Sequence, residues 1–254
     1  MTFTTETMGE GQGKTPRERR FDDKHRRILD AAMSLVERDG LAGLSIHKVA
    51  SAVDFTPGAL YRYFGSKDAL LSGLVTRVLD DVQEHLQEAH GLLPADCTAL
   101  ARVFALGHGY RAFALRYPER FGLLATTLAD SRVLIRERAD SEPVAIKLTA
   151  TFGTLARALV AAAEERTLVQ GDVPERVLCL FAFVQGLLQM DKQARHAPNV
   201  LDVERLLLRG TSALLAGWGA REAALEVART EADLVARALQ KGRPAKAKRP
   251  RSTW

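Results

Sequence analysis

The residues of this chain whose types and spacing best suit a chemical task lie between Thr56 and Lys67. Thr56 is a good N-cap, and Pro57 fits the first helical position because its missing amide donor costs nothing there. Ser66 is a second N-cap that places Lys67 in a first helical turn, where a cation opposes the helix dipole. Free backbone amides and an ammonium group together suit a phosphate. This segment therefore predicts a site for an anionic, phosphate-bearing partner.

The short helix after Thr56 is expected to bury only Leu60 and Phe64 and to leave the rest of its surface outside. The outward residues have the shape and charge to enter a DNA groove, and a soluble protein has little other reason to display them. They are Pro57, Gly58, Ala59, Tyr61, Arg62 and Tyr63.

Two upstream helices are predicted to hold this segment. The first ends at Asp39 and Gly40, because glycine tolerates a positive φ, and its apolar residues recur at helical spacing. These residues are Ile28, Leu29, Ala32, Leu35 and Val36. Ser45 caps the second helix, whose inward face holds Ile46, Val49, Ala50 and Val53. Only a turn of about three residues then precedes Thr56, which is the spacing of a helix-turn-helix.

The segment resembles the DNA-binding domain of the TetR family of transcriptional regulators, in which an apolar first helix and a Ser- or Thr-capped second helix precede the pattern L-Y-x-[HY]-F-x-x-K. The residues that match this pattern are Leu60, Tyr61, Tyr63, Phe64 and Lys67. One position departs from the family, which usually has glycine in the turn where this chain has Asp54. Aspartate is among the few residues that accept left-handed geometry, so we expect the turn to be kept with slight strain.

The resemblance implies which residues contact DNA. Phosphate contacts would come from Ser45, Tyr61, Tyr63 and Lys67. Base-edge contacts would come from His47, Pro57, Gly58, Ala59 and Arg62, with Thr56 at the start of the same helix. The alternative for Tyr61 and Tyr63 is aromatic packing against the first helix, and the alternative for Arg62 is a solvated charge.

The net charge of +5 is concentrated at the two ends of the sequence. It is −2 over residues 1–13, +4 over residues 14–67, −3 over residues 68–240 and +6 over residues 241–254, as a polyanion binder requires. The expected domains are a flexible basic arm (1–21), the DNA-binding domain (22–70), a ligand-binding and dimerisation domain (71–220), an additional amphipathic helix (221–240) and a disordered basic tail (241–254).

Each basic end has a predicted role. A flexible arm could lie along the minor groove beside the docked helix. In the tail, Gly242, Arg243 and Pro244 resemble an AT-hook, and a generic basic tail is the alternative that needs no motif. In either case the tail should add nonspecific affinity for DNA.

From Leu70 onward every segment is predicted to be helical, so the fold class is all-α: a three-helix DNA-binding domain followed by a larger helical domain. The expected segments are 67–90, 96–116, 118–130, 143–166, 174–195 and 202–218. The last two helices have apolar faces that need covering from two sides. In the resembled family these helices pair across a twofold axis, which implies a homodimer; burial within one subunit is the alternative. Close helix approach would be permitted by Gly186, Gly210 and Gly217.

A small-molecule effector would bind between the helices of the larger domain, among apolar groups with a few polar ones. The stretch from Gly109 to Phe121 also resembles the WHG C-terminal subtype of the family, which usually has a histidine where this chain has Gln185. The candidate lining residues are Phe104, His108, Tyr110, Arg111, Phe121, Phe152, Gln185 and Gln189. For each of them an ordinary place in the core or on the surface is the alternative.

No feature of the sequence predicts an enzyme, a metal site or a cofactor. It has no nucleophile elbow, no phosphate-cradling glycine loop and no HExxH motif. Cys97 and Cys179 lie in apolar helical contexts and are expected to be reduced and buried. No apolar run approaches the ~18 residues that a membrane helix needs, and we expect a cytoplasmic protein.

Together these observations predict a sequence-specific DNA-binding regulator, a ligand-responsive repressor that acts as a homodimer on a palindromic operator. A nucleoid-type protein that binds double-stranded DNA nonspecifically through its basic tails is the alternative.

Overall fold

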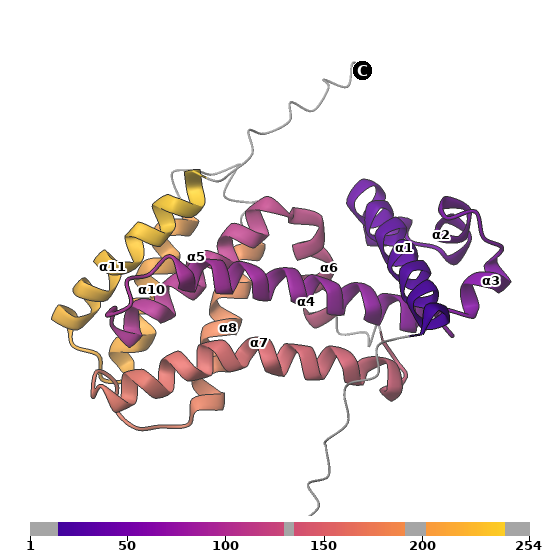
Figure 1. The fold of residues 1–254 in the computed structure, drawn as a ribbon. Helices are drawn as coiled ribbons and strands as arrows, with labels where there is room; N and C mark the ends of the chain where they lie inside the picture. Colours follow the sequence, from indigo (N-terminus) through magenta and orange to yellow (C-terminus); the bar gives the residue numbers. More distant parts are fainter. Residues whose placement is uncertain (1–14, 130–134, 191–201, 242–254) are drawn as a thin grey trace, which may run out of the picture. The chain divides into compact units, whose positions relative to one another are not determined.

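The structure is a computed structural model that describes residues 15–129, 135–190 and 202–241. Every element in these ranges is a helix, which confirms the predicted all-α class. The chain divides into two compact units, one that ends at Leu70 and one that begins at Leu71 (Figure 1).

The first unit contains α1 (Pro16–Asp39), the 3-10 helix η1 (Leu41–Gly43), α2 (Ile46–Ala52) and α3 (Pro57–Tyr61). α2 packs against both α1 and α3. The predicted inward residues of α1 and α2 are buried, apart from Leu29, which is half-buried. α1 ends at Gly40 with a φ of 72°, the positive value that the sequence predicted.

The first helix begins earlier than the sequence prediction placed it. Thr15 caps α1 because its hydroxyl accepts a hydrogen bond from the Glu18 amide, and the Glu18 carboxylate accepts one from the Thr15 amide at 2.7 Å. Residues 16–21 are therefore helical, and the expectation of a flexible arm over residues 1–21 is wrong for them. Residues 1–14 lie outside the described residues. The Thr-x-x-Glu pattern is the sequence signal for this early start.

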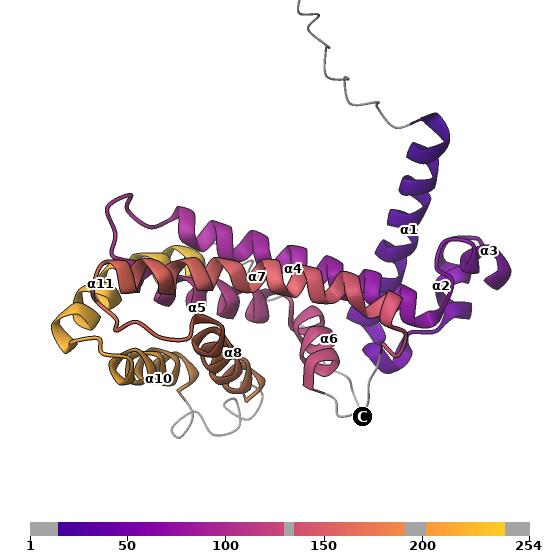
Figure 2. The ribbon, with the colours of Figure 1, turned by 90° about the horizontal axis from the view of Figure 1, so that it is seen from below.

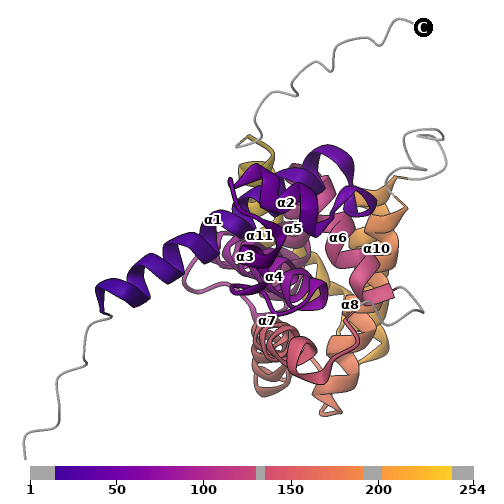
Figure 3. The same ribbon diagram turned by 90° about the vertical axis from the view of Figure 1, so that its right-hand side faces the viewer.

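α4 (Lys67–Gly91) begins in the first unit and continues into the second. The other helices of the second unit are α5 (Ala99–Arg116), α6 (Pro118–Ala129), α7 (Arg138–Glu164), α8 (Val173–Gln189), α10 (Val203–Gly217) and α11 (Glu222–Lys241). α5 is the central helix: it is buried along most of its length and packs against α6, α7, α8, α10 and α11. α8 lies beside α10 (Figures 2 and 3).

α8 and α10 pack closely where a phenylalanine of α8 meets a glycine of α10. The inward face of α8 is buried as predicted, except that Phe181 is half-buried. The ring of Phe183 on α8 occupies the space that a side chain at Gly210 on α10 would need. Gly210 therefore permits packing within the subunit. α8 ends at Gln189, before the predicted end at residue 195, which itself lies outside the described residues.

The additional helix predicted over residues 221–240 is α11, and it packs along α5 (Figure 1). Its apolar stripe is buried at Leu225, Ala228, Ala232 and Val235. The Glu231 carboxylate accepts hydrogen bonds from the Thr98 amide at 3.1 Å and the Thr98 hydroxyl at 2.7 Å, at the start of α5. α11 thus shields the central helix of the unit.

α7 runs through a proline at which the sequence prediction placed a break. The helix begins at Arg138 and contains Pro143, so the predicted start at Pro143 is wrong. A proline this near the start of a helix removes one intrahelical hydrogen bond, and the remaining turns of α7 outweigh that loss.

The sequence predicted no apolar stretch of membrane-spanning length. α7 differs from that expectation. Among the described helices it is the one whose length and composition would suffice to cross a membrane. The core helix of a soluble protein can have the same length and composition, so this finding alone is not evidence for a membrane protein.

Candidate functional site

α3 begins at a capped turn and is held by two buried side chains, Leu60 in the helix and Phe64 just after it. The Thr56 hydroxyl accepts a hydrogen bond from the Ala59 amide at 3.2 Å, and Pro57 occupies the first helical position, so both predicted start signals are confirmed. Leu60 is 0% exposed and Phe64 is 3% exposed. These two side chains fix one side of α3 and leave the other side to solvent.

The predicted DNA-contacting residues on the solvent side of α3 and beside it are all accessible, and we call this set the recognition surface. Its exposed members are His47, Thr56, Gly58, Tyr61, Arg62 and Lys67, and its half-buried members are Ser45, Pro57, Ala59 and Tyr63. A Cβ atom added at Gly58 would meet nothing within 4 Å, so the backbone there is open to close approach. None of these members is a carboxylate, and the exposed Asp54 lies two residues before the Thr56 cap.

The turn before α3 is strained at one residue. Asp54 has a φ of 58°, the left-handed geometry that the sequence predicted for it. The amide of the next residue, Phe55, donates to the Ala50 carbonyl at 2.9 Å and closes the turn. Asp54 therefore keeps the geometry for which glycine is the better residue.

Tyr61 and Tyr63 have different surroundings. The Tyr63 ring stacks on Phe21 of α1, with centroids 5.0 Å apart, and on Phe55, with centroids 5.8 Å apart. Aromatic packing against the first helix, the alternative that the sequence left open, thus applies to Tyr63. Tyr61 is 47% exposed. Sequence reasoning missed Phe21, although it lies seven residues before the buried Ile28 and so shares its helix face.

Lys67 lies in the first turn of α4, and Ser66 caps that turn by accepting a hydrogen bond from the Ala69 amide at 2.8 Å. Ser45 caps α2 in the same way, since its hydroxyl accepts from the Lys48 amide at 3.2 Å. Both predicted caps are confirmed.

The first half of α1 carries four of its six cations along one face. Arg17, Arg20, Lys24 and Arg27 recur at intervals of three or four residues, which places them on one side of the helix, and all four are exposed. Arg26 lies on another side and pairs with Asp23 at 3.7 Å. The helical geometry of this basic stretch presents charge on a rigid rod in place of the expected flexible arm.

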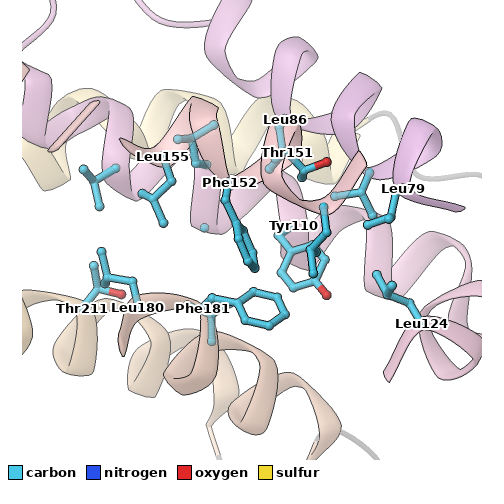
Figure 4. Close-up of a pocket in the computed structure, with 16 residues that line it drawn as sticks. Leu79, Leu86, Tyr110, Leu124, Thr151, Phe152, Leu155, Leu180, Phe181 and Thr211 are labelled. Atoms are coloured by element: carbon cyan, nitrogen blue, oxygen red, sulfur yellow. The ribbon is translucent and has the colours of Figure 1, made fainter. Parts of the chain in front are cut away.

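The second unit contains an apolar cavity of about 80 Å³ between α4, α5, α7 and α8. Two aromatic rings project into it, Phe152 from α7 and Phe181 from α8, with centroids 4.9 Å apart (Figure 4). Tyr110 from α5 completes the aromatic part of the lining, and its hydroxyl donates a hydrogen bond to Gln185 Oε1. Burial raises the pKa of the Tyr110 phenol, which stays neutral in the physiological range.

Comparison with protein families assigns both units. Residues 28–74 match the family of bacterial regulatory proteins named tetR, and residues 103–214 match the tetracyclin repressor-like C-terminal domain. The two matches together cover more than half of the chain. The chain belongs to the TetR family of bacterial transcriptional regulators.

Individual relatives of this TetR-family regulator include proteins named as repressors. The transcriptional repressor KstR of Rhodococcus jostii is 28% identical over 95 residues, which are 37% of this chain and 43% of KstR. The regulator BetI of Paraburkholderia phytofirmans is 30% identical over 69 residues, 27% of this chain and 35% of BetI. The chain thus spans less than half the length of each of these relatives.

Solved structures share the fold of this TetR-family regulator. A Rhodococcus sp. RHA1 protein of unknown function has a TM-score of 0.61 at 23% identity and covers 76% of this chain and 94% of its own. RolR in complex with resorcinol has a TM-score of 0.58 at 16% identity, with coverage of 84% and 96%. FadR of Bacillus subtilis in complex with stearoyl-CoA also reaches 0.58 at 16% identity, with coverage of 76% and 98%.

The candidate effector residues of the regulator fall in different places. Tyr110 and Phe152 line the cavity, and Gln185 and Phe121 each contact Tyr110. Phe104 is buried, outside the lining.

The remaining candidates lie away from the cavity. His108 and Arg111 line a separate hollow, where Arg111 pairs with Glu204 at 3.1 Å. Burial lowers the pKa of His108. Gln189 is exposed near the end of α8.

The two cysteines differ. Cys97 is buried as expected, whereas Cys179 is exposed, so the prediction that both are buried is wrong. Cys179 lies on the side of α8 that faces away from the second unit's core. Among the residues that the structure describes, no group of three or more His, Cys, Asp or Glu side chains could hold a metal ion.

Proposed function

We propose that this TetR-family regulator is a ligand-responsive repressor that binds a palindromic operator as a homodimer. The observation that carries the proposal is the recognition surface: an open face of α3 held on the buried Leu60 and Phe64, with no carboxylate among its members. A short capped helix of this kind suits insertion into the major groove.

The recognition surface divides by chemistry. Ser45, Tyr61, Tyr63 and Lys67 carry hydroxyl or ammonium groups that suit phosphate oxygens. Pro57, Gly58 and Ala59 are small enough for close approach and for contact with thymine methyl groups, and His47 and Arg62 supply hydrogen bonds to base edges. The basic face of α1 adds four cations that favour the DNA backbone.

The proposed dimer uses the sides of α8 and α10 that face away from the core. On α8 these exposed residues include Glu175, Leu178, Cys179, Ala182, Gly186 and Gln189, and the exposed Met190 follows the helix. On α10 they include Arg205, Arg209, Ala213, Ala216 and Gly217. A Cβ atom at Gly186 or Gly217 would meet nothing within 4 Å, which leaves room for a second copy. The small and apolar residues among these exposed residues suit an isologous four-helix interface.

The proposed mechanism is a change in the spacing of two recognition helices. A dimer that reads a palindrome holds these helices about one turn of DNA, ~34 Å, apart. A ligand that binds better to a body conformation with a different spacing shifts the population away from DNA. α4 is the proposed lever because it provides both Lys67 and three residues of the cavity lining, Leu79, Val82 and Leu86.

The cavity supports the ligand response. RolR and FadR, which share the fold, were solved in complex with resorcinol and with stearoyl-CoA. The cavity of this chain lies between helices and is mostly apolar, as ligand sites in helical proteins are.

Footprinting of the promoter region beside the gene tests the proposal. We expect a protected palindrome, and titration against that site and against random DNA of equal length should give an affinity ratio of roughly a thousand or more. A ratio near one would instead support nonspecific binding. Transcription from the protected promoter should rise when the protein is removed.

A further inference from the structure

Among the residues that the structure describes, the lining of the cavity contains no charged side chain. It consists of aliphatic residues, Gly107, two threonines and the aromatic residues Tyr110, Phe152 and Phe181. The Tyr110 hydroxyl already donates to Gln185, and the Thr151 hydroxyl donates to the Lys147 carbonyl at 2.9 Å. Few polar groups are therefore left to meet a ligand.

Cations near the cavity are occupied or separated from it. Arg120 pairs with Asp81 at 2.8 Å, and Lys147 pairs with Asp80. Arg102 and Arg157 line a different hollow, and Leu106, which is 5% exposed, is the one residue common to the linings of both. An ionised acid inside the cavity would lose its hydration and gain no counter-charge, which is strongly unfavourable.

The cavity favours apolar and aromatic groups. Phe152 and Phe181 meet edge to face at an interplanar angle of 60°, and Tyr110 lies 6.3 Å from Phe181 between centroids (Figure 4). Such rings present both edges and faces to a bound ring. A Cβ atom added at Gly107 would meet nothing within 4 Å, so there is open space at the α5 wall.

We infer that the effector of this regulator is an uncharged, predominantly apolar molecule that binds in this cavity. That the bound molecule acts as an effector rests on the proposed ligand response. The selectivity of the cavity can be measured without DNA. Binding and DNA release are therefore tested separately.

The first test compares two fluorescent probes that differ by one charged group. N-phenylnaphthylamine is neutral, and anilinonaphthalenesulfonate has the same ring system with an added sulfonate. Titration of the full chain with each probe should show saturable fluorescence enhancement by the neutral probe and at least about tenfold weaker binding of the anionic one.

A matched pair of variants locates the binding. Gly107→Leu fills the open space at the cavity wall and should weaken binding of the neutral probe by about tenfold or more. Gly122→Leu is the control, because Gly122 on α6 also has nothing within 4 Å of an added Cβ but lies outside the lining. Thermal unfolding of both variants confirms that they are folded.

A second pair of compounds tests whether the cavity binds an acid whose charged head group lies outside it, in the hollow lined by Arg102 and Arg157. Decanol should displace the neutral probe at concentrations at least about tenfold lower than decanoate at a pH where the acid is ionised. Equal potency would overturn the inference, because it would place an acid head at Arg102 and Arg157. Equal binding of the neutral probe by the parent chain and Gly107→Leu would overturn it as well.

DNA release by decanol is then measured on the footprinted operator. If the neutral compounds bind selectively but leave operator affinity unchanged, the proposed ligand response fails while the selectivity of the cavity stands.

Discussion

The ring of Phe21 stacks on the ring of Tyr63 with centroids 5.0 Å and planes 28° apart. Phe21 belongs to the early part of α1, and Tyr63 follows α3, so this contact joins the two ends of the first unit in sequence. Phe21 is 45% exposed, and its contribution to a buried core is correspondingly small. Its position beside Tyr63 suits a role in orienting that residue on the recognition surface.

Phe21→Ala should therefore weaken operator binding severalfold while reducing the free energy of unfolding by only about 1 kcal/mol, the usual worth of an aromatic pair. Fluorescence anisotropy with labelled operator and thermal unfolding measure the two effects. Phe21→Tyr keeps the ring and should bind like the parent. An affinity unchanged in Phe21→Ala would remove the positioning role.

Lys67→Ala should weaken binding to all DNA sequences alike. Because one phosphate contact is lost, the slope of log affinity against log salt should fall by about one unit. Arg237→Ala on α11 is the matched control, since it removes an exposed cation from the second unit. An unchanged slope in the Lys67 variant would take Lys67 off the list of phosphate contacts.

Asp54→Gly should preserve or raise stability, by up to about 1 kcal/mol, because glycine adopts the φ of 58° without steric cost. Asp54→Val should lower stability by about 1–2 kcal/mol, because a β-branched side chain is strained in that geometry. Chemical denaturation measures both. A glycine variant less stable than the parent would show that the Asp54 side chain contributes more than its backbone strain costs.

Acidification should destabilise the first unit through His25. Burial lowers the pKa of His25 from 6.5, and the charge of Asp22 raises it by a smaller amount. The His25 ring stacks on the Phe64 ring with centroids 4.3 Å apart. The folded state thus disfavours the protonated form, so the stabilisation is complete above pH 6.5 and is lost as the pH falls through the lowered pKa.

His25→Phe should accordingly flatten the dependence of unfolding free energy on pH between neutral and mildly acidic conditions. His108 has a shift of the same direction, so part of the dependence should remain. A variant with the parent's full dependence would exclude His25 as a source.

Gly186→Arg should convert the proposed dimer into monomer, because the new side chain would project from the exposed face of α8. Sedimentation velocity measures the change, and operator affinity should fall with it. Gly122→Arg on α6 serves as the control outside that face. A Gly186→Arg protein with the parent's oligomeric state would show that subunits do not meet there.

Several features of the recognition surface followed from the sequence because they depend on residues within one turn of chain. The Thr56, Ser45 and Ser66 caps each use a side chain and an amide three residues later. The left-handed Asp54 follows from the turn length between two caps and from what aspartate tolerates. The Thr15 cap is equally local, and the Thr-x-x-Glu pattern is its signal in the sequence.

The larger unit shows where local reasoning ends. A broad apolar face does not reveal which of its residues a neighbouring helix will cover. Gly210 packs under Phe183 of the same subunit, whereas Gly186 on the adjacent helix remains open. Cys179 is exposed although its sequence context resembles that of buried residues.

The sequence by itself determined the helix-turn-helix and its caps, because hydrogen bonds between near neighbours set these features, and its motif indicated the family. The tertiary structure alone decided that Phe21 reaches Tyr63, that α11 covers α5, and that Tyr110, Phe152 and Phe181 line a cavity whose described residues carry no charge. Those contacts join residues far apart in the chain, and they depend on how the helices pack and not on the preference of any one segment.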